Sequence, residues 1–308
     1  MTNGAPKLVV ITGPTASGKS SLAVELALKF GGEIISADSM QVYRGMDVGT
    51  AKPTLIERKG IDHHLVDVVN PDEEFNASLY RSLAKSLIEE IVGRERACFV
   101  VGGTGLYIKT LLGGLLKCPP VDFKIRHELN REYEECGSSF LHRRLKEIDP
   151  ESGVKIHPND KIRLIRALEV IELTKQPLSS LTREHAFRER PFQSLKICLS
   201  MKREILYERI NRRSVSMIKS GLVDETRRLL GMGYTEELKP MKSLGYRHII
   251  EFLKGKYSMN ETVRHIQRDT RRYAKRQLTW FRTDPEMIWT EPTQRTCIEK
   301  KIKEFYVN

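Results

Sequence analysis

The sequence has no long hydrophobic run and no low-complexity segment. The apolar run near its start covers only residues 8–11, far short of the roughly 20 apolar residues that a membrane-spanning helix needs. No secretory leader is recognisable either, so we expect a chain without membrane spans or export signal. Aromatic residues make up only 7% of the 308 residues, yet the hydrophobic fraction of 40% allows a packed core and excludes a wholly disordered chain.

Cysteine is scarce and scattered. No two cysteines form a C-x-x-C pair, which argues against a disulfide framework and against a zinc site. This usage is typical of the reducing cytoplasm, which is the expected location. The five cysteines are Cys98, Cys118, Cys136, Cys198 and Cys297.

The positive charge is concentrated in one part of the chain. Residues 1–115 contain 12 Lys/Arg and 13 Asp/Glu, whereas residues 116–308 contain 40 and 27, so the whole excess of the +12 net charge lies in the second part. A basic part joined to a neutral part favours a polyanionic partner such as a nucleic acid. A solvated, lysine-rich helical surface would give the same composition.

Short apolar, β-branched runs alternate with helical patterns in the first hundred residues. Runs at residues 7–12, 33–37 and 97–101 predict buried strands, and residues 21–30 and 76–92 have helical spacing. Strands that alternate with helices imply a parallel sheet, so we expect an α/β fold with helices flanking the sheet.

The pattern changes at the Cys-Pro-Pro segment of residues 118–120. Residues 123–174 are charged and helical, strand character returns at residues 195–201, and the chain beyond residue 203 is again helical and basic. We therefore predict an all-helical insertion domain of residues 119–190, within a catalytic core of residues 1–118 and 191–308.

The first predicted strand runs into a phosphate-binding motif, G-x-x-x-x-G-K-S. Its glycines let backbone N–H groups converge on phosphate oxygens, and the following helix adds its dipole. The lysine supplies a mobile cation, and the last serine hydroxyl is a ligand for Mg²⁺. The alternative is a simple Gly-rich turn. The motif comprises Gly13, Pro14, Thr15, Ala16, Ser17, Gly18, Lys19 and Ser20, and it predicts a P-loop NTPase-like fold.

An NTP-hydrolysing protein of this type also needs an apolar strand that ends in a metal-binding aspartate. The runs at residues 97–101 and 195–201 end without a carboxylate, and only the short segment that ends at Asp67 offers one. This weakens the prediction of NTP hydrolysis. A P-loop kinase of a nucleotide or small metabolite remains as an alternative.

Two polar side chains follow predicted strands. Asp38 comes directly after the second strand and Thr104 lies in the Gly-rich segment after the third. Because ligands bind at the carboxyl ends of parallel strands, Asp38 is a candidate general base that faces the bound phosphate compound. The alternative is that Asp38 caps a helix beginning near Ser39. The Thr104 hydroxyl is a candidate contact for phosphate or substrate, or a turn residue.

Seven blocks together resemble the tRNA dimethylallyltransferases, also called tRNA isopentenyltransferases, of the bacterial type. They follow the family's order from residue 12 to residue 282, and the second is highly specific. The blocks are GPTASGKS (13–20), SADSMQVYRGMDVGTAKP (36–53), HHLVD (63–67), GGTGLYI (102–108), HPNDKIRLIRALEV (157–170), KSLGYR (242–247) and KRQLTWFR (275–282).

The resemblance implies transfer of a dimethylallyl group from dimethylallyl diphosphate to the exocyclic amine of the adenosine 3′ of the anticodon in tRNA. The P-loop would hold the diphosphate leaving group, with Mg²⁺ near Ser20 and with Arg213 aimed at the diphosphate. Asp38 would take the proton from the amine, and Thr104 would position the reacting groups. The transition state has allylic cation character and disfavours water, so an enclosed channel is expected.

The resemblance also implies tRNA contacts, which agree with the basic second part of the chain. Arg268, Arg272, Lys275 and Arg282 recur at helical spacing and predict a cationic stripe, whose alternative is a solvated helix face. Trp280 and Phe281 either stack on bases or belong to the core. The chain is expected to act as a monomer, without zinc. A third hypothesis, beside the transferase and the P-loop kinase, is a non-enzymatic RNA-binding regulator. The implied tRNA-binding residues are Asp38, Ser39, Met40, Gln41, Thr104, Arg126, Ile162, Arg163, Leu164, Ile165, Arg166, Lys242, Ser243, Leu244, Gly245, Tyr246, Arg247, Lys275, Arg276, Gln277, Leu278, Thr279, Trp280, Phe281 and Arg282.

Overall fold

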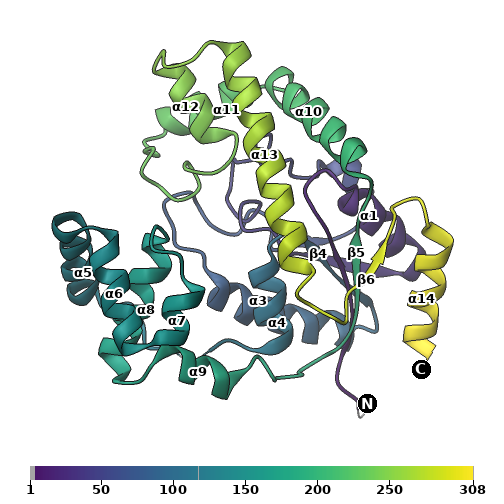
Figure 1. Cartoon of the computed structure of the whole chain (residues 1–308). Helices are drawn as coiled ribbons and strands as arrows, with labels where there is room; N and C mark the ends of the chain where they lie inside the picture. Colours follow the sequence, from purple (N-terminus) through teal and green to yellow (C-terminus); the bar gives the residue numbers. More distant parts are fainter. Residues whose placement is uncertain (1–3, 117, 308) are drawn as a thin grey trace. The chain divides into compact units, whose positions relative to one another are not determined.

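A parallel sheet forms the centre of the fold (Figure 1). The structure is a computed structural model and describes residues 4–116 and 118–307. Within these residues the sheet has six strands in the order β3-β2-β4-β1-β5-β6, and every neighbouring pair is parallel. This confirms the predicted α/β fold. The strands are β1 (Lys7–Thr12), β2 (Gly32–Ser36), β3 (His63–His64), β4 (Ala97–Gly102), β5 (Gln193–Leu199) and β6 (Ile288–Thr290).

Helices cover both faces of the sheet, which is why residues 8–11 of β1 are all apolar. Leu8 and Val10 belong to one apolar cluster with α3 (Ala77–Gly93) and α4 (Gly105–Gly113). Val9 and Ile11 belong to a second cluster with α1 (Lys19–Phe30) and α14 (Arg295–Val307). Successive side chains of a strand point to opposite faces, so one run of residues supplies both cores.

The ends of the first helices follow local rules. Gly31, at φ 63°, ends α1 in the left-handed conformation that favours glycine, directly after the predicted helical residues 21–30. Asn76 caps α3 by accepting hydrogen bonds from the N–H groups of Ser78 and Leu79. Beyond residue 203 the sequence predicts helices, which agrees with α14 but not with the strand β6. Ile298 and Ile302 of α14 are 1% and 0% exposed.

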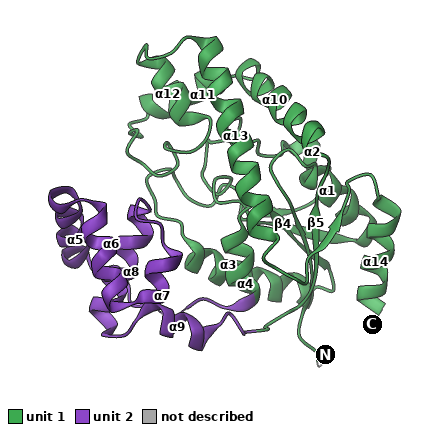
Figure 2. Ribbon diagram, viewed as in Figure 1, with its two compact units in different colours: residues 1–112, 190–308 green, residues 113–189 purple. Residues whose placement is uncertain are grey.

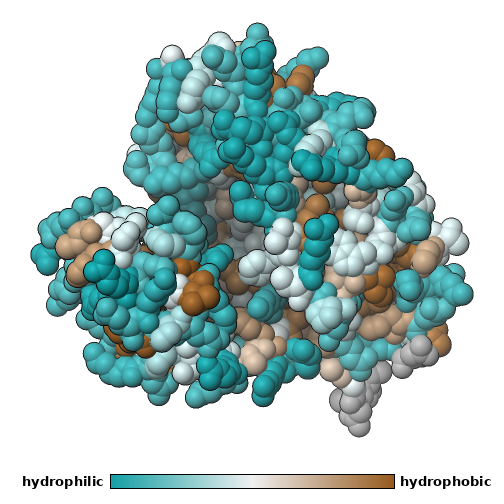
Figure 3. Space-filling model, viewed as in Figure 1, coloured by the Kyte–Doolittle hydropathy of each residue, from teal (hydrophilic) through white to brown (hydrophobic). Residues whose placement is uncertain are grey.

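A helical layer follows β5 along the chain. It comprises α10 (Arg203–Lys219), α11 (Leu222–Gly231), α12 (Tyr246–Leu253) and α13 (Met259–Phe281), and the 23-residue α13 packs along α10 through Leu206, Ile210 and Ala274. The visible surface over α11, α12 and α13 is largely hydrophilic (Figure 3). This confirms the predicted return to helical, basic sequence. A short helix, α2 (Leu55–Arg58), lies in the long segment after β2.

The helical insertion forms a second compact unit, Gly113–Glu189 (Figure 2). It begins earlier than the predicted residue 119 because its incoming and outgoing segments touch: a Cβ on Gly113 would lie 2.8 Å from the carbonyl oxygen of Phe187. Residues 1–3, 117 and 308 of the predicted ranges lie outside the described residues. The unit contains α5 (Phe123–Cys136), α6 (Ser138–Ile148), α7 (Pro150–Lys155), α8 (Lys161–Thr174) and α9 (Leu178–His185) around its own core of Leu129, Leu141, Leu145, Leu164 and Leu168.

No helix among the described residues is both long enough and apolar enough to cross a membrane.

Candidate active site

The loop between β1 and α1 has the geometry of a phosphate cradle. Gly13 and Gly18 adopt φ 143° and φ 90°, and a Cβ on Gly13 would lie 2.7 Å from the carbonyl oxygen of Leu199. Among the described residues no side chain caps the N-terminus of α1, so its first N–H groups remain free for an anion. The buried Ser17 hydroxyl likewise has no hydrogen-bond partner within the described part of the chain. The loop is therefore open to phosphate oxygens, as its sequence predicts.

The two cations predicted at this loop, Lys19 and Arg213, both lie there. The Lys19 ammonium donates to the Pro14 carbonyl at 3.2 Å, and burial lowers the pKa of Lys19 to about 8, although the nearby Asp38 carboxylate acts in the opposite direction. Arg213 of α10 donates to the Thr15 hydroxyl at 3.3 Å, and burial also lowers the pKa of Arg213. The structure thus brings Arg213 to the loop, as the resemblance implies.

A second arginine of α10 lies at the same loop and was missed in the sequence. Arg209 precedes Arg213 by one helical turn, and its Nη1 lies 3.5 Å from the carbonyl oxygens of Ala16 and Ser17. The signal for it was the i, i+4 spacing of the two arginines, which places both on one face of a helix.

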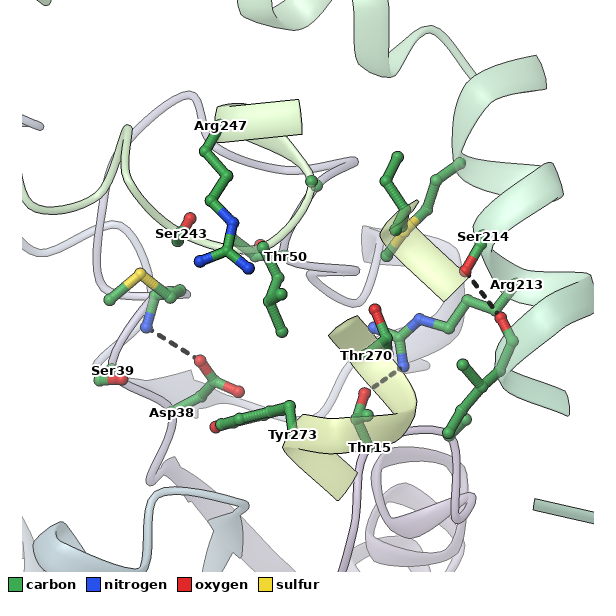
Figure 4. Close-up of a pocket in the computed structure, with 18 of the residues that line it drawn as sticks. Thr15, Asp38, Ser39, Thr50, Arg213, Ser214, Ser243, Arg247, Thr270 and Tyr273 are labelled. Carbon is green, nitrogen blue, oxygen red and sulfur yellow. Dashed lines mark hydrogen bonds between the residues drawn. The ribbon is translucent and has the colours of Figure 1, made fainter. Parts of the chain in front are cut away.

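Asp38 follows β2 at the edge of the sheet where the phosphate loop also lies (Figure 4). Its Oδ1 accepts hydrogen bonds from the N–H groups of Met40 at 2.9 Å and Gln41 at 3.3 Å. These bonds close a turn, and no helix begins at Ser39, so the alternative of a helix cap is wrong. The Asp38 carboxylate acts on the pKa values of both Lys19 and Arg213, so it is close to both cations.

Thr104 lies beside Asp38 and supports the same loop. Its hydroxyl accepts a hydrogen bond from the Ser39 N–H at 3.0 Å, and its own N–H donates to the Ala37 carbonyl at 3.1 Å. The Gln41 side chain also serves the local backbone, since its Nε2 lies 3.4 Å from the carbonyl oxygens of Thr50 and Ala51. Thr104 and Gln41 therefore shape the loop around Asp38.

A cavity of about 310 Å³ connects these elements (Figure 4). Thr15 and Arg213 line it at the phosphate loop, and Asp38 and Tyr273 lie beside one another on its wall. Burial raises the pKa of Tyr273, with a further contribution from Asp38, so the phenol stays neutral. The cavity has the size of a small-molecule site. Apolar side chains also line it, among them Met40, Ile210, Met217, Leu244 and Ile266.

The segment 242–247 lines the cavity with all but one of its residues, namely Lys242, Ser243, Leu244, Gly245 and Arg247. The exception is Tyr246, which is fully buried and donates from its hydroxyl to Glu225 at 2.6 Å. A direct tRNA contact through the Tyr246 side chain is therefore corrected to a packing role. Arg247 donates to Asp269 of α13 at 2.8 Å.

Asp269 organises several cations on α12 and α13. It accepts hydrogen bonds from Arg247, His248 and Arg268, and the bond from Arg268 contributes most to holding the pKa of Asp269 below its usual range. Arg272 lies 3.4 Å away. Part of the predicted stripe is thus paired with a carboxylate of its own helix.

The last motif block divides into an exposed and a buried set. Gln277 and Phe281 are 6% and 2% exposed, so a direct tRNA contact through these two side chains is corrected to an interior role. Leu278 is half-buried. Trp280 covers Gly105, where a Cβ would lie 2.2 Å from the indole Nε1. The exposed residues are Lys275, Arg276, Thr279, Trp280 and Arg282.

The predicted tRNA contacts of the second unit divide in the same way. Ile162 is 82% exposed and Arg163 is also exposed, whereas Leu164 and Ile165 belong to the core, so a tRNA contact through these two side chains is corrected.

Arg126 and Arg166 bind one carboxylate. They donate to the buried Glu169 at 2.8 Å and 2.9 Å, and both guanidinium groups remain partly exposed. Burial alone would raise the pKa of Glu169, but the hydrogen bonds from these arginines lower it.

The described residues contain no cluster of three or more His, Cys, Asp or Glu side chains that could hold a metal ion. Asp67, the one carboxylate that the sequence offered for a metal, lies 2.6 Å from the buried ammonium of Lys52. Ser20, the predicted Mg²⁺ ligand, is exposed in the first turn of α1 beside the phosphate loop.

Fold and site together define a P-loop α/β protein whose phosphate loop lies next to a carboxylate. Residues 41–284 match the family model described as IPP transferase. The tRNA dimethylallyltransferase 2 of Syntrophus aciditrophicus is 50% identical over 287 residues, which cover 93% of this chain and 92% of that protein. The tRNA dimethylallyltransferase of Geobacter metallireducens is 48% identical over 301 residues, 97% of each chain.

Solved structures agree. The tRNA isopentenylpyrophosphate transferase of Bacillus halodurans superimposes with a TM-score of 0.73 at 40% identity, over 97% of this chain and 96% of that one. A eukaryotic dimethylallyltransferase described as acting on tRNA superimposes with a TM-score of 0.78 at 29% identity. The match covers 94% of this chain and 75% of that one. The chain belongs to the IPP transferase family, and the transferase class predicted from its sequence is confirmed.

Proposed function

We propose that this chain transfers the dimethylallyl group of dimethylallyl diphosphate to the exocyclic amine of the adenosine 3′ of the anticodon in tRNA. The observation that carries the proposal is the arrangement of the cavity. The phosphate loop and Arg213 meet the Asp38 carboxylate there, and apolar side chains line the same space. The same carboxylate also acts on the pKa of Lys19. Membership of the family supports the same conclusion.

The phosphate loop would bind the diphosphate, and Lys19 and Arg213 would stabilise the charge that grows on it as it leaves. The Ser20 hydroxyl fits Mg²⁺, because this ion prefers oxygen ligands and completes its coordination with substrate phosphates and waters. Such an ion would neutralise part of the diphosphate charge when bound.

The transfer itself needs one base. The amine nitrogen attacks the first carbon of the dimethylallyl group, the bond from that carbon to the diphosphate oxygen breaks, and the proton of the amine passes to the Asp38 carboxylate. A positioned base of this kind contributes typically 10²–10⁴-fold in rate. The hydrogen bonds from Met40 and Gln41 to Oδ1 orient the carboxylate for this step.

The acceptor base must leave the stack of the anticodon loop to reach Asp38. Exposed cations of α13, chiefly Lys275 and Arg276, would hold the tRNA backbone beside the cavity, and Arg276 and Arg247 also line it. Acting on tRNA implies a cytoplasmic location. We expect a monomer, because one chain supplies all residues of the site.

The proposal is tested by nucleoside analysis of tRNA after incubation with the protein, Mg²⁺ and labelled dimethylallyl diphosphate. The expected product is adenosine with the label on its exocyclic amine, at the position 3′ of the anticodon. A parallel reaction with labelled ATP and small acceptors tests the kinase alternative. Phosphate transfer without tRNA labelling would overturn the proposal, as would tRNA binding without turnover in either reaction.

A further inference from the structure

One buried amide of α13 joins two loops of the active site. Gln277 is 6% exposed, and its Oε1 accepts a hydrogen bond from the Thr15 N–H of the phosphate loop at 2.8 Å. Its Nε2 donates to the carbonyl of Gly103 at 3.0 Å. The two partners are a backbone donor and a backbone acceptor, so they fix which end of the amide faces which loop.

The packing around this amide leaves it no freedom. A Cβ on Gly103 would lie 2.2 Å from Nε2 of Gln277, and the two hydrogen bonds prevent the amide from moving aside. Trp280 follows Gln277 by three residues, and a Cβ on Gly105 would lie 2.2 Å from its indole Nε1. The helix α13 therefore contacts residues 103–105 through two side chains that are one helical turn apart.

Each loop that Gln277 contacts is also hydrogen-bonded to a residue at or next to a proposed functional group. Thr15 also accepts from Arg213, the cation aimed at the diphosphate. Gly103 precedes Thr104, whose hydroxyl holds the Ser39 N–H next to Asp38. The amide thus connects the diphosphate side and the base side of the cavity through one side chain.

We propose that Gln277 is a positioning residue that sets the distance between the phosphate loop and the Asp38 loop, and that it makes no contact with tRNA. This inference rests on the proposed function. Only an amide satisfies both partners: a carboxylate would face the Gly103 carbonyl without a proton to donate, and an apolar side chain would leave both backbone groups unpaired. A displacement of about 1 Å between reacting groups is enough to cost on the order of 10²-fold in rate.

The test compares Gln277→Glu, Gln277→Leu and the wild-type chain. The control is Gln267→Leu. This variant also removes an amide from α13, but Gln267 donates to the Asn211 carbonyl of α10 and not to a loop of the active site. We expect kcat/KM for dimethylallyl diphosphate to fall on the order of 10²-fold in both Gln277 variants. The control should retain its rate, and tRNA affinity should be the same in all four proteins.

The Gln277→Glu variant keeps the size of the side chain and adds a pH readout that is independent of folding. As the pH falls, the introduced acid becomes protonated and can again donate to Gly103. Its kcat relative to wild type should therefore rise toward low pH, at a temperature where both proteins are fully folded.

Three outcomes decide the matter. Normal kcat in folded Gln277 variants would overturn the inference, and so would weakened tRNA binding at normal kcat, which would make Gln277 a tRNA contact. Absence of tRNA labelling by the wild-type chain would instead overturn the proposed function. In that case calorimetric titration with inorganic diphosphate still tests the amide, because an unbraced phosphate loop should bind the anion more weakly in the variants.

Discussion

The Tyr246 hydroxyl donates a 2.6 Å hydrogen bond to the Glu225 carboxylate, and the same carboxylate accepts from the N–H groups of Asp47, Val48 and Gly49. The aromatic ring lies so close to Gly49 that a Cβ there would be 2.5 Å away. Because Gly49 lines the cavity, this buried pair from α11 and α12 shapes a wall of the site from behind. Tyr246 therefore shapes the cavity through the loop of residues 47–49 and does not itself line it.

Replacing Tyr246 by phenylalanine should lower the free energy of unfolding by about 1.5–3 kcal/mol, the range for a hydrogen bond to a charged group. Affinity for tRNA should not change. Urea denaturation and a tRNA-binding titration measure the two effects. The matched variant is Arg247→Ala, at the next, exposed residue, where we expect weaker tRNA binding and a loss of stability of at most about 1 kcal/mol, the range for an exposed ion pair such as that with Asp269. Weaker tRNA binding by Tyr246→Phe at normal stability would restore Tyr246 as a contact.

Asp38→Asn should lose transfer by about 10²–10⁴-fold while the protein keeps its fold and its affinity for tRNA. Asparagine retains an oxygen that can accept from Met40 and Gln41, so the turn is preserved and only the base is removed. Single-turnover labelling of tRNA measures the loss. Asp38→Ala removes the turn acceptor as well and serves as the comparison. Wild-type rates in Asp38→Asn would eliminate Asp38 as the base.

Binding of inorganic diphosphate should weaken above about pH 8. Burial lowers the pKa of Lys19 to about 8, so the free protein carries the ammonium below that pH and loses its charge as the pH rises through it. Calorimetric titrations across this range measure the effect. Arginine keeps its proton throughout, so Lys19→Arg separates titration of the lysine from titration of the diphosphate. The prediction fails if both proteins show the same decline.

Affinity for tRNA should depend steeply on salt, and Lys275→Ala should reduce the slope of log K against log salt by about 1. Lys275 is exposed on α13, in the segment that also lines the cavity through Arg276. Lys303→Ala is the matched control, because this exposed lysine belongs to α14, which packs on the sheet. Equal slopes for the two variants would show that the α13 cations do not contact the tRNA backbone.

Features that depend on neighbouring residues could be predicted from the sequence. The phosphate loop, the strand before it and the helix after it are contiguous, and their glycines determine the backbone conformation locally. The parallel sheet follows from the alternation of apolar runs and helical patterns. Asp38 could be placed because the carboxyl ends of parallel strands meet at one edge of a sheet.

The motif blocks marked the residues of the site without separating packing from contact. Neighbours within one block differ in burial. Leu164 is buried and Ile162 is exposed, and in the same way Tyr246 is buried and Arg247 is exposed. Only the tertiary structure decided this, because burial depends on which segment packs against each face of a helix. The same holds for Gln277, whose partner Thr15 is 262 residues away in the chain. A hydrogen bond across such a separation leaves no local pattern, whereas the loop that it braces is encoded by eight consecutive residues.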